Sequence, residues 1–280
     1  MPYPYTMKCI VKKALGTTKT TSVIPGMIPI VWFGDYEAYS SSPTKIITVG
    51  LNPSDREFGN PTQPCTSLRF PAYTGCVCSL IKALNGYFHI NPYNDWFKSG
   101  FEPILNGLNA SYYGGKTNTA LHTDICSPWA TNPTWSKLPR AERETLMKEG
   151  FPLWMKLIQK LAPDIILFSI PQRHIDRLKT ESNGLLTQNQ PLCIINTDSK
   201  GIIRKRPIVI GEGAYGSALA IFGKTWNVPF GALSRIQKSK LGGCILSTMG
   251  QTGLEPSVLQ HPDYKTVPIG LVSNRSIVSR

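Results

Sequence analysis

Short, continuously apolar segments recur along this chain, and each is bounded by residues that break regular structure. Residues 45–51 (KIITVGL) stop at an Asn-Pro pair, and residues 165–170 follow a Pro-Asp pair. Residues 120–126 form another candidate strand. Strands buried on both faces of a sheet have this pattern, and the segments are too short to cross a bilayer. Further strands are predicted at residues 192–195, 207–210 and 219–222.

Helical patterns lie between these strands. Residues 76–84 have helical apolar spacing, and Pro139 followed by acidic residues is typical of a helix N-terminus. Gly150 and Pro152 are expected to interrupt that helix before an apolar face resumes over residues 153–161. Alternating strands and helices predict an α/β fold, a three-layer α/β/α sandwich with a mostly parallel central sheet.

The 280 residues are expected to form a single domain over residues 1–280. Its ends, at about residues 1–40 and about 240–280, are expected to be irregular extensions. In parallel sheets, ligands bind beyond the carboxyl ends of the strands. The loops after Leu51, Asp124 and Phe222 are therefore the candidate functional loops.

The charge balance indicates the kind of partner. Thirty Lys and Arg residues against 17 Asp and Glu give a net charge of +13. Such an excess attracts polyanions, and DNA is the partner that we expect. The alternative is a basic surface that serves solubility alone. With no apolar signal segment at the start, we expect a cytoplasmic protein with no membrane contact. We also expect it to be a monomer.

The cysteines and histidines indicate neither a metal site nor a disulfide framework. The seven Cys are odd in number, and the four His have no metal-ligand spacing. We therefore expect no metal and no cofactor. The segment GEGAYG at residues 211–216 lacks the later acidic residue of a dinucleotide site, and is interpreted as a turn.

The first candidate loop is Gly50-Leu51-Asn52-Pro53-Ser54. Glycine permits close backbone approach, and the Asn52 amide at a strand end can face a cleft. The alternative is a structural turn, because Asn-Pro is a common turn pair. The segment VGLNPS resembles the first active-site motif of the uracil-DNA glycosylase superfamily, in its G-x-N-P-G form. This resemblance implies that Asn52 orients the attacking water, with Ser54 in place of a glycine beside the DNA.

The resemblance also implies an aromatic ring that stacks on an extruded base. The candidates are Phe70, Tyr73 and the nearer Phe58. Their alternative role is packing, which is the commoner one for aromatic residues in loops.

In the second loop, Asp124 occupies the position where the superfamily has a base-reading asparagine. An ionised carboxylate only accepts hydrogen bonds, so it disfavours uracil O4 and suits the N4 amino group of cytosine. Such a pairing is worth about 1–3 kcal/mol of discrimination. Excision of ordinary cytosine would destroy a genome, so we predict a modified cytosine, such as some bacteriophages carry. Alternatively, Asp124 caps the following loop.

The third loop, residues 226–235 (WNVPFGALSR), resembles the second superfamily motif. By resemblance, Asn227 contacts the base or the leaving oxygen, and Phe230 or Leu233 fills the gap left by the base. Ser234 and Arg235 would lie at phosphate. The superfamily's histidine is absent here. The alternative is a buried aromatic turn that precedes a helix.

These patterns predict a monofunctional DNA glycosylase that leaves an abasic site. The resemblance runs from about Lys45 to Arg235 and leaves both ends unexplained. Three alternatives stay open: a uracil or mismatch glycosylase of base-excision repair, a catalytically silent nucleic-acid-binding module, and a hydrolase of free nucleosides or nucleotides.

Overall fold

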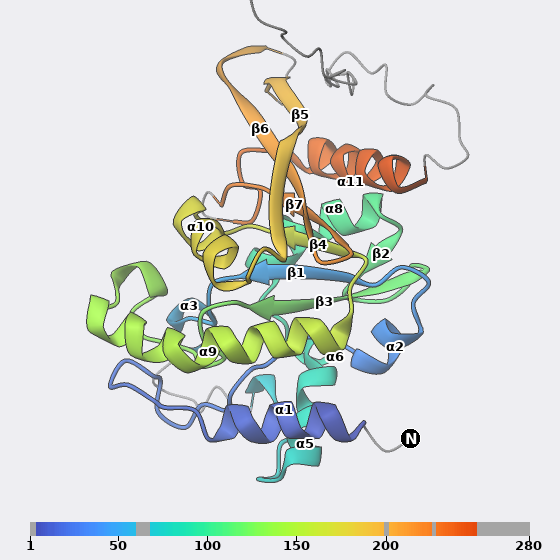
Figure 1. Cartoon of the computed structure of the whole chain (residues 1–280). Helices are drawn as coiled ribbons and strands as arrows, with labels where there is room; N and C mark the ends of the chain where they lie inside the picture. Colours follow the sequence, from blue (N-terminus) through green and yellow to red (C-terminus); the bar gives the residue numbers. More distant parts are fainter. Residues whose placement is uncertain (1–3, 60–67, 199–201, 226–227, 251–280) are drawn as a thin grey trace, which may run out of the picture.

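The protein is described by a computed structural model over residues 4–59, 68–198, 202–225 and 228–250. Within these residues a seven-stranded sheet has the order β2-β3-β1-β4-β7-β6-β5 (Figure 1). Its strands are β1 (Ile46–Gly50), β2 (Ala110–Ser111), β3 (Asn118–Asp124), β4 (Ile165–Phe168), β5 (Leu186–Thr197), β6 (Ile203–Tyr215) and β7 (Ala218–Phe222).

The sheet is mostly parallel, as predicted. Strands β2, β3, β1, β4 and β7 pair in parallel. Only β6 pairs antiparallel with both β7 and β5 among the described strands. The segments predicted at residues 45–51, 120–126, 165–170 and 219–222 correspond to β1, β3, β4 and β7. The other two predicted strands are the middles of a long hairpin, which rises from the body in Figure 1.

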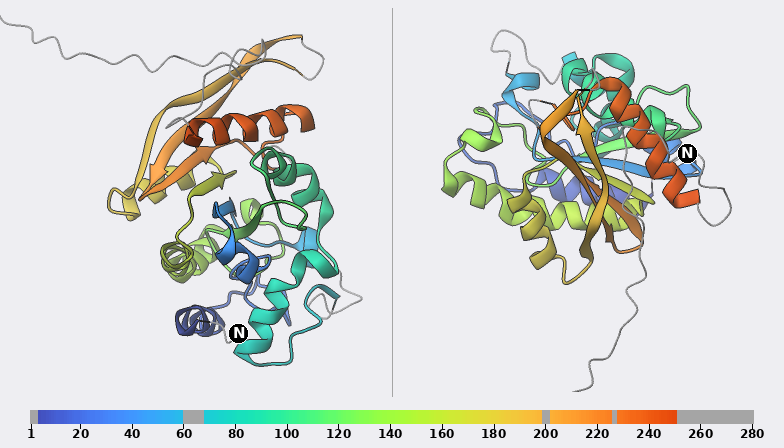
Figure 2. Two further views of the ribbon diagram at one scale, coloured as in Figure 1. Left: turned by 90° about the vertical axis from the view of Figure 1, so that its right-hand side faces the viewer. Right: turned by 90° about the horizontal axis from the view of Figure 1, so that it is seen from above.

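Helices flank the sheet, so the prediction of a mixed α/β protein is confirmed. In the left view of Figure 2, α9 and α10 lie on one side of the parallel strands and α8 on the other. The helical segments are α1 (Tyr5–Leu15), α2 (Tyr36–Ser41), α3 (Asp55–Phe58), α5 (Val77–Asn85), α6 (Tyr87–Ile90), α7 (Asn94–Trp96), η1 (Phe97–Phe101), α8 (Glu102–Gly107), η2 (Trp135–Lys137), α9 (Arg140–Leu161), α10 (Gln172–Glu181) and α11 (Arg235–Gly250). No described helix is long and apolar enough to span a bilayer.

The predicted break in the helix at Gly150 and Pro152 is wrong. A single helix, α9, passes through both residues. A Cβ atom on Gly150 would lie 2.2 Å from the carbonyl oxygen of Cys126, so the glycine allows α9 to approach the end of β3. Tertiary packing of the apolar face thus outweighs the local cost of Gly and Pro.

The N-terminal stretch is also more regular than expected. Helix α1 buries Met7, Ile10, Val11 and Ala14, and it packs against α9 and α5. Its apolar residues recur at helical spacing, a signal that the surrounding Thr, Ser and Pro residues obscured. At the other end, α11 continues to Gly250, while residues 251–280 lie outside the described residues.

Helices α8 and α11 approach closely through glycine. A Cβ atom on Gly242 would lie 2.2 Å from the carbonyl oxygen of Ile104, whereas one on Gly243 would have nothing within 4 Å. We expect Gly242→Ala to lower the free energy of unfolding by about 1–3 kcal/mol through overpacking. Gly243→Ala is the matched control, and it should be neutral or stabilising by up to about 1 kcal/mol. Thermal unfolding measures both, and equal losses would contradict the close helix contact.

Candidate active site

A pocket of about 540 Å³ opens where the parallel strands end. It is lined by residues that end β1, β3, β4 and β7 or lie within three residues after them, namely Asn52, Asp124, Ser169 and Thr225. The chain leaves β1 toward the side of α8, whereas it leaves β3 and β4 toward α9 and α10 (Figures 1 and 2). Ligands bind at such a reversal in open parallel sheets. The predicted loops after β1, β3 and β7 therefore meet in one pocket.

Gly50 and Asp124 are direct neighbours across the β1–β3 pair. A Cβ atom on Gly50 would lie only 2.6 Å from Asp124 Oδ1. The glycine of the first loop thus provides the space that the carboxylate of the second loop occupies. Asp124 lines the pocket, although only 5% of its side-chain surface is exposed.

This contact gives a prediction for stability. We expect Gly50→Ala to lower the free energy of unfolding by about 1–3 kcal/mol, because the added carbon overlaps the carboxylate. In an Asp124→Ala background the same change should cost clearly less, because the overlapping atom is gone. Chemical denaturation of the four proteins of this cycle measures the coupling. Additive effects would mean that Gly50 does not make room for Asp124.

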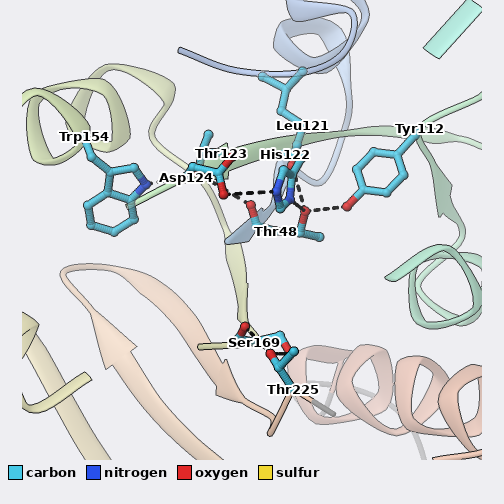
Figure 3. Close-up of polar contacts among 9 residues, drawn as sticks. All are labelled: Thr48, Tyr112, Leu121, His122, Thr123, Asp124, Trp154, Ser169 and Thr225. Carbon is cyan, nitrogen blue, oxygen red and sulfur yellow. Dashed lines mark hydrogen bonds and ion pairs between the residues drawn. The ribbon is translucent and has the colours of Figure 1, made fainter. Parts of the chain in front are cut away.

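A buried polar chain stands behind Asp124 (Figure 3). His122 Nε2 lies 3.6 Å from Asp124 Oδ1, and His122 Nδ1 lies 2.8 Å from Thr48 Oγ1. Thr48 Oγ1 in turn contacts the Tyr112 hydroxyl. Burial raises the pKa of Tyr112 well above its ordinary value, so the phenol stays neutral. The hydrogen bond to Thr48 fixes the imidazole ring beside Asp124 Oδ1.

The Asn52 side chain is held by Thr131. Asn52 Nδ2 donates to Thr131 Oγ1 at 2.8 Å, and that hydroxyl donates to the Pro133 carbonyl at 3.0 Å. Because the hydroxyl proton is used at Pro133, Thr131 accepts from Asn52 and fixes the orientation of its amide. The amide oxygen of Asn52 can then accept a hydrogen bond from a water or ligand in the pocket. Ser54 lines the same wall, and its backbone pairs with Thr131.

Glu57 is a pocket residue that the sequence analysis missed. It lies on α3, just after the first loop, and accepts a hydrogen bond from the Tyr87 hydroxyl. Burial of the carboxyl, its largest influence, raises the pKa of Glu57 to about 8. Its position five residues after Asn52 was the available signal, but a single glutamate in a polar loop is not distinctive.

The predicted stacking residues do not line the pocket. Phe58 and Phe70 are 1% exposed and stack on each other in the core with a centroid separation of 6.0 Å. Tyr73 is partly buried against the same core. The aromatic residues that do line the pocket are Phe33, Tyr93, Trp96, Phe97 and Trp135. Trp135 has a buried indole N–H without a hydrogen-bond partner among the described residues.

The described part of the third loop, residues 228–235, is a buried aromatic turn that precedes helix α11, which was the alternative interpretation. Phe230 is buried with a φ of 51°, and its ring covers Gly223, where a Cβ atom would lie 2.1 Å away. Leu233 is also buried, so neither residue projects as a wedge. Ser234 caps α11 by accepting from the Gln237 N–H at 3.3 Å, and Arg235 is exposed. Asn227 lies outside the described residues.

A cysteine–histidine pair lies close to the pocket, with Cys126 Sγ and His174 Nδ1 3.6 Å apart. Burial raises the pKa of Cys126 well above its ordinary value and lowers that of His174 to about 4. Both groups are therefore neutral near pH 7, and Cys126 is not an activated nucleophile.

Comparison with known proteins identifies no relative. The chain matches no family model, and no curated protein or solved structure is significantly similar to it. Among the described residues, no three His, Cys, Asp or Glu side chains are grouped to hold a metal ion. The functional argument therefore depends on the pocket residues themselves.

Proposed function

We propose that this protein is a monofunctional DNA glycosylase that removes a modified cytosine and leaves an abasic site. The observation that supports this most is the meeting of Asn52 and Asp124 in one pocket at the ends of adjacent parallel strands. We further propose that the fold is the sandwich of the uracil-DNA glycosylase superfamily, which the sequence motifs resemble.

Asp124 would select the base. Its free carboxylate oxygen accepts hydrogen bonds only, which matches the N4 amino group of cytosine and repels uracil O4. His122 Nε2 lies 3.6 Å from Oδ1, and this contact favours one orientation of the carboxylate. The pocket volume, about 540 Å³, lies within the range of small-molecule sites and leaves space for a substituent on a pyrimidine ring.

Asn52 would position the water that attacks the sugar. Glycosidic hydrolysis passes through an oxocarbenium-like state, with positive charge on the sugar and negative charge on the leaving base. The Asn52 amide oxygen accepts a hydrogen bond from the water, while Thr131 keeps the amide from turning. The partly exposed Tyr93 and Trp96 line the pocket and can stack on the base.

The charge of the chain supports a polyanionic substrate. A net charge of +13 favours binding to phosphates, and Arg56 lies at the pocket itself. Binding to DNA should therefore weaken steeply with salt. We propose that the protein acts on DNA as a monomer.

The test is an abasic-site assay. Labelled oligonucleotides carry uracil, cytosine, hydroxymethylcytosine or glucosylated hydroxymethylcytosine, and alkali cleaves any abasic product. Asn52→Ala is the control for contaminating activity. Cleavage of modified cytosine but not uracil is the expected result. Cleavage of uracil alone would overturn the base assignment. DNA binding without Asn52-dependent product would favour a silent module, and hydrolysis of free nucleotides alone would favour a small-molecule hydrolase.

A further inference from the structure

Glu57 is held in the pocket by two successive hydrogen bonds. The Tyr93 N–H donates to the Tyr87 hydroxyl oxygen at 2.9 Å, and the Tyr87 hydroxyl donates to Glu57 Oε1. Tyr87 is buried, and its hydroxyl has only one proton to donate. This fixes which group donates and which accepts in both hydrogen bonds. A proton on the Glu57 carboxyl therefore belongs on Oε2. Among the described residues, no hydrogen bond engages that oxygen.

The surroundings of Glu57 keep that proton in place at neutral pH. Burial of the carboxyl and the negative charge of Asp124 raise its pKa, while the hydrogen bond from Tyr87 and the charge of Arg69 lower it. The balance is a pKa of about 8. The other titratable and charged groups around the same pocket are Arg56, Tyr93, Asp95 and His122.

The other residues of the proposed reaction do not supply this proton. The Asp124 carboxylate can only accept hydrogen bonds, and the amide nitrogen of Asn52 donates to Thr131. The negative charge that develops on a leaving cytosine still needs an acid. Two carboxyl groups in one site, one protonated and one ionised, are a common division between proton donor and acceptor.

We infer that Glu57 is the general acid of the proposed glycosylase, donating the proton on Oε2 to the departing base. This inference rests on the proposed function. The C1′–N1 bond breaks with its electron pair going to the base, and the base takes the Glu57 proton at a ring nitrogen or oxygen. The water held by Asn52 forms the new C1′–O bond, and the proton that it loses returns through solvent to the Glu57 carboxylate. Water and nucleotide thus give an abasic sugar and a neutral base.

The experiment measures single-turnover rate constants on the best substrate from about pH 6 to about pH 10. The wild-type rate constant should be level at low pH and fall tenfold per pH unit above the pKa of Glu57, about 8 in the free protein. Glu57→Gln should be slower by about 10²–10⁴-fold and should lose this fall. Tyr87→Phe removes a hydrogen bond that lowers the pKa of Glu57, so the fall should move to higher pH. A purely structural role would not produce that shift.

Glu212 provides the matched control. Burial also raises the pKa of its carboxyl, but it lies on β6 and does not line the pocket. Glu212→Gln should keep the wild-type profile. A level wild-type profile, or a fall that persists in Glu57→Gln, would overturn the role of Glu57 while leaving the glycosylase proposal intact. No Asn52-dependent abasic product on any substrate would overturn the glycosylase proposal, and this inference with it.

Discussion

Replacing Asp124 by asparagine is expected to move the base preference from modified cytosine toward uracil. Asparagine keeps the shape of the side chain but adds an NH₂ donor, which can pair with uracil O4. Each matched or mismatched contact is worth about 1–3 kcal/mol, so the ratio of kcat/KM values for the two bases should change by about 10²–10⁴-fold. Competition between two labelled oligonucleotides in one reaction measures the ratio directly.

Asp124→Ala is the control for this switch. It removes both the attraction to cytosine N4 and the repulsion of uracil O4. Activity on modified cytosine should therefore fall, and any gain on uracil should be smaller than in Asp124→Asn, which also adds a donor. Because His122 is packed against the carboxylate, unfolding of each variant should be measured alongside. If Asp124→Asn lost activity on modified cytosine and gained none on uracil, base selection would not be the role of Asp124. Capping of the following loop would then be the better interpretation.

The sequence predicted those parts of the fold whose hydrophobic pattern is uniform along the segment. Strands β1 and β4 are buried throughout, and such strands have continuous apolar runs. The β5–β6 hairpin was predicted only in part, because exposed residues such as Ile203 and Val209 alternate with buried ones and basic residues interrupt the run. Helix α9 was predicted as two pieces because Pro152 usually ends a helix. The structure shows that one helix continues through it, with its apolar face buried on both sides of the proline.

The sequence predicted those residues of the candidate site that lie at the ends of predicted strands. Asn52 and Asp124 end or follow strands that the sequence identified, so their meeting followed from a parallel sheet. The aromatic residues that line the pocket were not predictable, since a ring in a loop becomes either core or pocket wall only through tertiary packing. Phe58 and Phe70 pack on each other, whereas Trp96 reaches the pocket. The sequence analysis missed Glu57 for a similar reason. Its raised pKa comes from burial and from neighbours that are distant in sequence.

Replacing Asn52 by alanine is expected to slow the chemical step by about 10²–10³-fold while DNA binding stays unchanged. In the proposed reaction Asn52 acts in the transition state by holding the water, and its removal would leave the basic surface and the Asp124 contact in place. Single-turnover rates and equilibrium binding to the same oligonucleotide separate the two effects. An equal loss in binding would show that Asn52 contacts the bound base instead of the water.

Thr131 tests whether the orientation of the amide matters. Thr131→Val keeps the volume of the side chain but removes the acceptor that fixes Asn52 Nδ2. The amide can then turn, and losing one such hydrogen bond should slow the reaction by about tenfold. Thr131→Ser keeps the hydroxyl and should restore the rate. If Thr131→Val equalled the wild type while Asn52→Ala was inactive, the water would be held by Asn52 in either orientation, and the role assigned to Thr131 would be wrong.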